Sequence, residues 1–211
     1  AMPDVSVADR GRITSEMNRV LAALHSVDIN AVGLGDYGPE GNYFERQVGR
    51  WSKQYRASET APIPAMDQLM DALVGERPED DGQRALVHGD YRIDNMIFDA
   101  TGTQCRAVLD WELSTIGHPF ADLAAVIMQW QLPAGSEGRG MGGLDRAALG
   151  LPSDQEFIAQ CCERRGLTGI DLGVSDTDQD GLVRYKRKLA HEECDVVTLV
   201  SAGSDPDPYA E

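Results

Sequence analysis

Apolar residues recur at helical spacing near the start of the chain. In the segment ITSEMNRVLAALHSVD, one stripe holds Ile13, Met17, Val20, Leu21 and Leu24. These positions follow the i, i+4, i+7, i+8, i+11 pattern of an amphipathic helix with one buried face. The next segment, NAVGLGDYGPEG, is rich in glycine and proline and is typical of a loop.

Two further helices are predicted before residue 80. Asn42 followed by Glu45 forms an N-cap pair that opens the first of them. Its inward stripe is predicted to contain Phe44, Val48, Trp51 and Tyr55. The other is predicted from Pro64 to Val74, with an inward stripe of Met66, Leu69, Met70 and Leu73. We also expect the three tryptophans, Trp51, Trp111 and Trp130, to lie in the core.

The pattern changes after the acidic turn RPEDDGQR. Short apolar runs at residues 85–88, 95–99 and 105–111 predict strands, and the turn DATGTQ joins the last two into a β-hairpin. Helical spacing returns over residues 120–130. Ser153 and Glu156 form a capping box that opens one more helix, which Gly166 would end. Residues 1–170 are therefore predicted as one domain, and residues 171–211 as an atypical polar tail that is partly disordered.

Charge and composition narrow the class of protein. The 211 residues include 19 basic and 35 acidic side chains, a net charge of −16. Nucleic-acid binding and anionic-membrane binding both need basic surface, so neither is expected. The sequence contains no run of about 18 apolar residues, the length that a bilayer-spanning helix needs. The four cysteines form no CxxC pair, which favours reduced thiols and a cytoplasmic protein.

Chemistry-bearing residues gather in LVHGDYRIDNMIFD and in AVLDWE. A strand leads into His88, Gly89 and Asp90, Asn95 starts the next strand, and the hairpin returns Asp110 to the end of a third strand. Two carboxylates and one carboxamide oxygen can therefore meet at one sheet edge. Such hard oxygen donors suit Mg²⁺, which takes few protein ligands beside phosphate oxygens. A carboxylate for the proton of a nucleophile, next to an Asn–Asp pair for metal, is typical of phosphoryl transfer.

These motifs resemble a known family. HGDYRIDN is similar to the HGDxxxxN catalytic loop of aminoglycoside phosphotransferase-like kinases, and LDWE is similar to their metal-binding segment. Together with MNRVLAALHSVD, GNYFERQVGRWSKQYRASE and LSTIGHPFADLA, roughly residues 10–170 resemble the phosphotransferase domain found alone or fused to acyl-CoA dehydrogenases. The resemblance implies an α+β, mostly helical fold: the C-terminal lobe of a protein-kinase-like fold, with a small β-hairpin that carries the site.

The resemblance also implies a role for single residues. It makes Asp90 the catalytic base or hydroxyl-orienting residue, and it makes Asn95 and Asp110 the Mg²⁺ ligands. His88 matches a position that braces the catalytic loop, and Asp122 matches a carboxylate that supports the loop backbone from a helix. Two more residues are candidates for lining the site or contacting substrate, Arg92 and Glu112.

The implied activity is ATP- and Mg²⁺-dependent transfer of the γ-phosphoryl group to a hydroxyl of a small molecule. Hydroxyacyl-CoA-like compounds are the first acceptor candidates, and aminoglycosides or other amino alcohols follow. No glycine-rich phosphate loop or lysine-bearing strand precedes the HGD motif, so we expect the N-terminal lobe to be absent or supplied elsewhere. A truncated, catalytically inactive fragment or binding module is therefore the alternative. A metal phosphohydrolase would need further histidine or aspartate ligands, and the four histidines form no HxH or HD pair.

Overall fold

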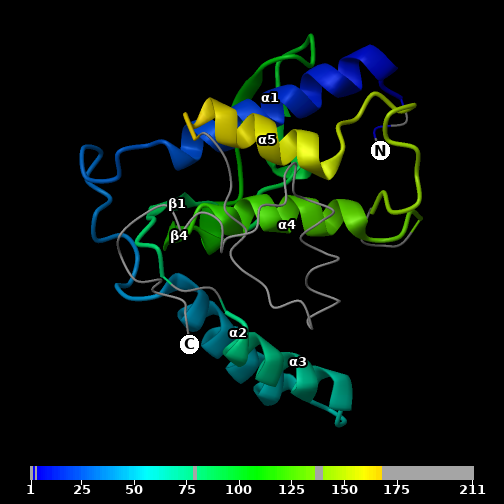
Figure 1. Ribbon diagram of the computed structural model, residues 1–211. Helices are drawn as coiled ribbons and strands as arrows, with labels where there is room; N and C mark the ends of the chain where they lie inside the picture. Colours follow the sequence, from blue (N-terminus) through cyan, green and yellow to red (C-terminus); the bar gives the residue numbers. More distant parts are fainter. Residues whose placement is uncertain (1, 3, 78–79, 136–139, 168–211) are drawn as a thin grey trace, which may run out of the picture.

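The computed structural model describes residues 2, 4–77, 80–135 and 140–167 (Figure 1). The predicted tail, residues 171–211, lies outside this part of the chain. The helices are α1 (Val7–His25), α2 (Tyr43–Ser58), α3 (Pro64–Gly75), α4 (Phe120–Gln131) and α5 (Asp154–Arg164). The strands are β1 (Ala85–Val87), β2 (Met96–Phe98), β3 (Cys105–Val108) and β4 (Thr115–Gly117), with 3-10 turns η1 (Ile93–Asn95) and η2 (Trp111–Leu113). None of the described helices is both long and apolar enough to cross a membrane.

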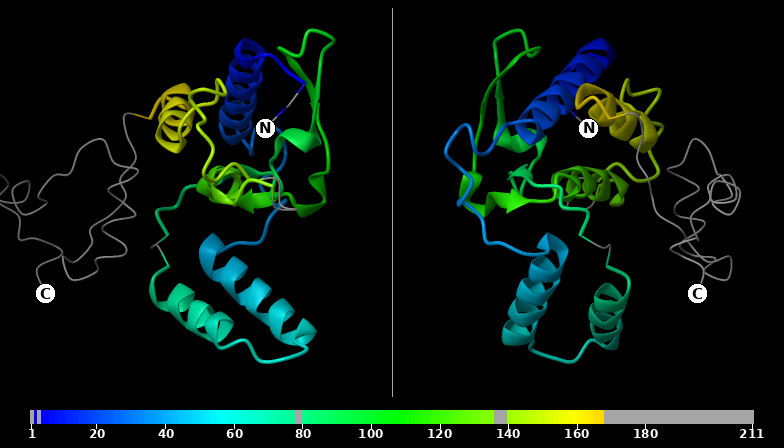
Figure 2. Two further views of the ribbon diagram at one scale, coloured as in Figure 1. Left: turned by 90° about the vertical axis from the view of Figure 1, so that its right-hand side faces the viewer. Right: turned by 60° about the vertical axis from the view of Figure 1, so that its left-hand side comes forward.

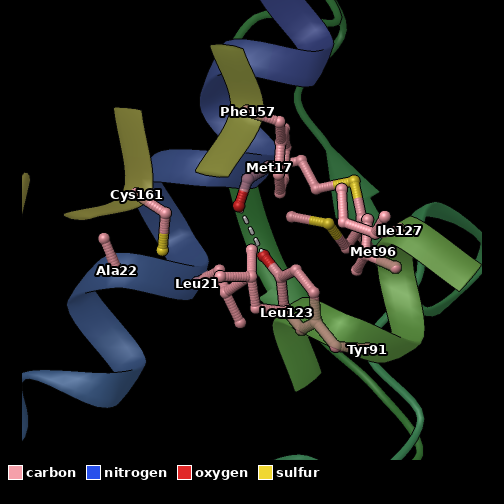
Figure 3. Packing of buried hydrophobic residues seen from close by; sticks show 10 residues of the cluster. Met17, Leu21, Ala22, Tyr91, Met96, Leu123, Ile127, Phe157 and Cys161 are labelled. Atoms are coloured by element: carbon pink, nitrogen blue, oxygen red, sulfur yellow. Dashed lines mark hydrogen bonds between the residues drawn. The ribbon is translucent and has the colours of Figure 1, made fainter. Parts of the chain in front are cut away.

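The core lies among three helices. α1 and α5 pack side by side, and α4 runs below them in the view of Figure 1. The predicted stripe of α1 faces this core, since Met17 and Leu21 are buried there against residues of α4 and α5. Figure 3 shows how the side chains from these elements meet. The buried cluster consists of Met17, Leu21, Ala22, Tyr91, Met96, Leu123, Val126, Ile127, Phe157 and Cys161.

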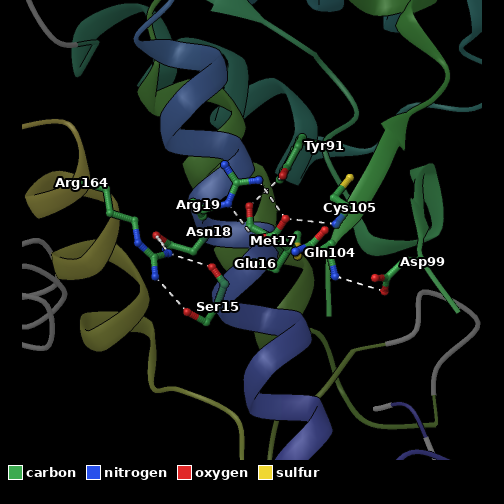
Figure 4. A network of polar contacts seen from close by, with 10 residues as sticks. All are labelled: Ser15, Glu16, Met17, Asn18, Arg19, Tyr91, Asp99, Gln104, Cys105 and Arg164. Carbon is green, nitrogen blue, oxygen red and sulfur yellow. Dashed lines mark hydrogen bonds and ion pairs between the residues drawn. The ribbon is translucent and has the colours of Figure 1, made fainter. Parts of the chain in front are cut away.

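Polar contacts connect α1 with β3 and with α5 (Figure 4). Glu16 forms an ion pair with Arg19 at 2.7 Å, and it also accepts a hydrogen bond at 3.0 Å from the backbone N–H of Cys105 at the start of β3. On the other side, Arg164 of α5 donates to the side-chain oxygen of Asn18 at 2.8 Å. The orientation of α1 is therefore set by hydrogen bonds as well as by apolar packing.

Two small antiparallel sheets connect this core to the site. The predicted hairpin is present as β2–β3, with Met96 opposite Val108. The other sheet pairs β1 with β4, and its register places Ala85 opposite Gly117 and Val87 opposite Thr115. The sequence pattern did not predict β4. The β1–β4 pairing brings the residue after β1, His88, close to the segment that precedes β4.

The helix pair α2–α3 corrects one prediction. The N-cap of α2 is confirmed, because the Asn42 side chain accepts the backbone N–H of Glu45 at 3.0 Å. The inward stripes were wrong, since neither helix has a buried residue and Trp51 is 48% exposed. Both views of Figure 2 show the reason: the two helices lie against each other, apart from the body that holds the core.

The expected placement of the tryptophans was right for only one of them. Trp130 packs against the core cluster, whereas Trp51 lies on α2 and Trp111 is 38% exposed in η2. The capping box that opens α5 is confirmed, because the Ser153 and Glu156 side chains each bond the other's backbone N–H. Gly166 follows the end of this helix with a φ of 71°.

Candidate active site

The loop that follows β1 turns sharply at a glycine. Gly89 has a φ of 86°, a conformation that side-chain-bearing residues rarely adopt. A Cβ at this position would lie 2.5 Å from the carbonyl oxygen of Leu113. Two requirements therefore call for glycine here, the left-handed turn and the close approach of η2. The turn directs the chain into Asp90, which is partly buried.

Asp90 and Asn95 are joined by two hydrogen bonds. The Nδ2 atom of Asn95 donates to the backbone oxygen of Asp90 and to its Oδ2, each at 3.0 Å. The amide nitrogen of Asn95 faces Asp90. Its Oδ1 atom is therefore available to accept a hydrogen bond or to bind a cation. Oδ1 of Asp90 likewise has no hydrogen-bond partner among the described residues.

Asp110 follows a residue that is hydrogen-bonded to Asn95. The backbone N–H of Leu109 donates to the carbonyl oxygen of Asn95 at 2.8 Å, so Asp110 lies in the segment that leaves the β2–β3 hairpin. Asp110 has a φ of 67°, and it is the sole non-glycine residue with positive φ within the described ranges. Aspartate tolerates this left-handed conformation better than most residues. Its exposed carboxylate has no hydrogen-bond or ion-pair partner in the described part of the chain.

A buried carboxylate holds the loop from below. Asp122, in the first turn of α4, is 1% exposed and accepts the backbone N–H groups of His88 and Gly89, both at 2.8 Å. The imidazole of His88 is fully buried, and its Nε2 lies 2.9 Å from the carbonyl oxygen of Leu109. Both side chains thus contact backbone groups of the catalytic loop or of Leu109, and their role as supports of a catalytic residue stays a prediction.

The remaining two predicted residues are less closely tied to the site. Arg92 forms an ion pair with Asp94 at 2.7 Å, and this contact raises the pKa of its guanidinium. Glu112 is exposed on η2 and makes no hydrogen bond among the described residues. Neither side chain joins the Asp90–Asn95 hydrogen bonds, so their assignment as site-lining residues stays a prediction.

Sequence reasoning missed one member of the support. His25 ends α1, and its Nε2 lies 3.0 Å from Oδ2 of Asp122, with both side chains 1% exposed. A signal was present in the sequence, because His25 follows Leu21 by four residues and therefore continues the buried stripe. A histidine on an apolar stripe needs a polar partner, and that partner lies 97 positions further along the chain.

A cleft of about 140 Å³ lies at the other end of the β1–β4 pair. It is bordered by Tyr43, Arg46, Arg84, Gly117 and His118, among others. The β1–β4 register explains its location, because Ala85 and Gly117 pair at the end of the sheet opposite to His88. None of the predicted site residues lines this cleft.

The chain is similar to known proteins. Residues 3–155 match the model of the phosphotransferase enzyme family. Acyl-CoA dehydrogenase family member 10 of Mus musculus is 42% identical over 81% of this chain and 16% of its own length. Family member 11 of Rattus norvegicus is 42% identical over 79% of this chain and 21% of its own length. The chain thus spans about a fifth or less of the length of these relatives.

A solved structure is also similar. The crystal structure of a Ralstonia eutropha protein, provisionally assigned as an aminoglycoside phosphotransferase, is 50% identical in sequence and superimposes with a TM-score of 0.76. The match covers 80% of this chain and 51% of that protein. The fold is therefore the kinase-like fold of the aminoglycoside phosphotransferases, with mixed helices and small sheets.

Proposed function

Because this chain belongs to the phosphotransferase enzyme family, we propose that it transfers the γ-phosphoryl group of ATP to a hydroxyl of a small molecule in a Mg²⁺-dependent reaction. In this proposal Asp90 binds the acceptor hydroxyl, and Asn95 and Asp110 bind the metal ion. His88 and Asp122 hold the loop that carries Asp90. The reaction relies mainly on positioning and charge stabilisation, as is usual for phosphoryl transfer.

One observation carries the proposal. Asn95 contacts Asp90 directly and the residue before Asp110: its side-chain amide nitrogen donates to the Asp90 carboxylate at 3.0 Å, and its backbone carbonyl oxygen accepts from the N–H of Leu109 at 2.8 Å. The backbone of Asp110 therefore begins one residue after a direct contact with the Asp90–Asn95 loop. This juxtaposition supports a shared site for a hydroxyl and a divalent cation.

The donor set suits Mg²⁺. Oδ1 of Asn95 and the carboxylate of Asp110 are hard oxygen ligands without partners among the described residues. Mg²⁺ needs only a few protein ligands when phosphate oxygens and water complete its coordination. When bound, the ion would neutralise negative charge on the transferred phosphoryl group.

Asp90 is suited to the proton of the acceptor. The hydrogen bond from Asn95 occupies its Oδ2, which leaves Oδ1 to accept a hydrogen bond from a hydroxyl group. The loop backbone cannot shift easily, because Asp122 binds the two preceding N–H groups. Asp90 would therefore align the hydroxyl oxygen for in-line attack and receive its proton.

We propose a hydroxyacyl-CoA-like compound as the first acceptor candidate and an aminoglycoside or amino alcohol as the second. The relatives named as acyl-CoA dehydrogenase family members favour the former. The similarity to the Ralstonia eutropha protein favours the latter. Both candidates present a hydroxyl group to Asp90.

A non-catalytic binding module is the alternative. The family's phosphate-covering loop and lysine strand do not occur between residue 1 and the HGD motif of this sequence. Titration of the chain with MgATP separates the two functions. Micromolar affinity favours the enzyme, and no detectable binding favours the module.

The activity assay uses γ-labelled ATP with a hydroxyacyl-CoA, an aminoglycoside and an amino alcohol as acceptors. Asp90→Asn should lower the transfer rate by about 10²–10³-fold, because the variant keeps the shape but loses the charge that binds the hydroxyl proton. Asp71→Asn, at an exposed position on α3, is the matched control and should retain the wild-type rate. Equal rates in wild type and Asp90→Asn would contradict the assignment of Asp90.

A further inference from the structure

We propose that Tyr37 is a positioning residue that orders the segment after Asp110 by donating a hydrogen bond to Ser114. The loop of residues 30–41 would thus control the candidate metal ligand from a distance. This inference rests on the proposed function, in which Asp110 binds the metal.

The contact between Tyr37 and Ser114 has a defined direction. The two hydroxyl oxygens lie 2.7 Å apart, although 77 positions separate the residues. Ser114 donates its own hydroxyl proton to the carbonyl oxygen of Trp111 at 2.5 Å. A serine hydroxyl has one proton, so Tyr37 must be the donor in the bond between the two residues. Two hydrogen bonds in series therefore run from the Tyr37 hydroxyl through the Ser114 hydroxyl to the carbonyl oxygen of Trp111, the first residue of η2.

Ser114 completes the η2 turn. Its backbone N–H and its hydroxyl both donate to the Trp111 carbonyl oxygen, at 3.0 and 2.5 Å. Trp111 directly follows Asp110, and its ring centroid lies 4.7 Å from that of His88. The series of hydrogen bonds that starts at Tyr37 thus ends on Trp111, the residue next to the candidate metal ligand Asp110.

Two loops pack closely against the same segment. A Cβ on Gly38 would lie 2.6 Å from the backbone nitrogen of Ile116 and 2.9 Å from Oγ1 of Thr115. The loop that carries Tyr37 therefore rests directly on β4. Gly89 of the catalytic loop also approaches this segment, since a Cβ there would lie 2.5 Å from the carbonyl oxygen of Leu113. The Tyr37 loop and the catalytic loop thus both pack against the segment between Asp110 and β4.

Asp110 needs such support on its C-terminal side. Its N-terminal neighbour, Leu109, is held at both backbone groups by Asn95 and His88. Asp110 itself has a φ of 67° and a carboxylate with no partner in the described residues. The orientation of this carboxylate therefore depends on how firmly η2 is held, and Tyr37 provides a side-chain hydrogen bond to the residue that ends η2.

Burial alone does not explain Tyr37. Tyr37 is 48% exposed, so its ring adds little to the apolar core. Replacing the hydroxyl with hydrogen should therefore leave the fold intact. This property makes Tyr37→Phe a specific test of the hydrogen bond.

The experiment measures hydrogen exchange and transfer kinetics in the full chain. Tyr37→Phe should raise amide exchange in a peptide covering residues 109–114 by about fivefold, the effect expected for one lost hydrogen bond. It should lower kcat by a similar factor and change the KM for ATP and acceptor by less than about twofold. Ser114→Ala should have larger effects, because it also removes the hydroxyl bond to the Trp111 carbonyl oxygen, and adding Tyr37→Phe to it should change nothing further. Tyr55→Phe is the matched control, since the Tyr55 hydroxyl has no hydrogen-bond partner in the described structure.

The outcomes separate this inference from the proposed function. Unchanged exchange in Tyr37→Phe would overturn the inference, whether or not the chain transfers phosphate. Raised exchange with an unchanged kcat in an active protein would overturn the role in positioning. Raised exchange in a chain whose wild type is inactive would support the ordering of η2 and would count against the proposed function instead.

Discussion

His25 at the end of α1 and Asp122 at the start of α4 meet at 3.0 Å, and both side chains are 1% exposed. The same carboxylate binds the backbone N–H groups of His88 and Gly89. A single side chain thus connects two helices with the loop that presents Asp90. The position of the candidate catalytic residue is consequently linked to the stability of the core.

Asp122→Asn should destabilise the protein. The substituted amide keeps one oxygen acceptor but turns an N–H donor toward groups that also donate, which leaves buried donors unpaired. Each unpaired buried group costs about 1–3 kcal/mol, so we expect a loss on the order of 2 kcal/mol or more. Urea unfolding measures the change, with the exposed Asp71→Asn on α3 as control. A loss no larger than that of the control would contradict the supporting role of Asp122.

Substituting glycine by alanine should have opposite effects at two positions. Gly89→Ala places a Cβ in a left-handed turn and 2.5 Å from the Leu113 carbonyl oxygen, which should cost about 1–3 kcal/mol. Gly49→Ala lies within α2, where a Cβ meets nothing within 4 Å. Alanine is a better helix former, so this variant should gain up to about 1 kcal/mol. Thermal unfolding of both variants checks the signs, and equal shifts would show that the turn at Gly89 is not strained by a side chain.

Glu16→Gln should lower the free energy of unfolding at neutral pH but not at acidic pH. The hydrogen bonds from Arg19 hold the pKa of Glu16 below its ordinary value of 4.5. A carboxyl group with a lowered pKa in the folded state contributes stability above the unfolded value, and this stability is lost as the pH falls through the folded value. We expect a difference of about 1 kcal/mol at pH 7 that shrinks below pH 4.5. Urea titrations between pH 3 and 7 test this, and a pH-independent difference would point to packing alone.

Cysteine alkylation should follow burial. Burial raises the pKa of Cys161 to about 11, and the reactive thiolate is therefore scarce at pH 8, on the order of one molecule in a thousand. Cys105 is partly exposed, and we expect iodoacetamide to modify it before Cys161 and Cys162. Labelling at Cys161 should accelerate as the pH rises toward 11. Peptide mapping with and without urea is the measurement, and equally fast labelling of Cys105 and Cys161 in the folded protein would contradict the expected order.

Local signals in the sequence were accurate where the interaction is local. The Asn42–Glu45 cap and the Ser153–Glu156 capping box each join residues three positions apart, and both are present. The β2–β3 hairpin was also predictable, since one short turn connects two apolar runs. The predicted burial of the apolar stripe of α2, which includes Trp51, was wrong. An apolar face shows which side of a helix avoids water, but it does not show which element covers that side.

Long-range contacts were not predictable in the same way. The pairing of β1 with β4 joins segments about 30 residues apart, and β4 has only three residues, too few for a visible alternation. The link between His25 and Asp122 crosses 97 positions, so neither residue indicates its partner. Tyr37 lies in a segment whose composition predicted only a loop, and its bond to Ser114 depends on how that loop rests on β4.

The sequence by itself determined the helices, the hairpin and the identity of the oxygen-bearing side chains Asp90, Asn95 and Asp110, because spacing and residue type are properties of the chain. The resemblance already named His88 and Asp122 as loop supports, but only the tertiary structure decided which atoms they bind and that His25 contacts Asp122. Hydrogen bonds such as those made by Asp122 and Tyr37 depend on distances of about 3 Å between segments far apart in the chain. Such distances are set by the packing of whole elements, and this packing is a property of the fold as a unit.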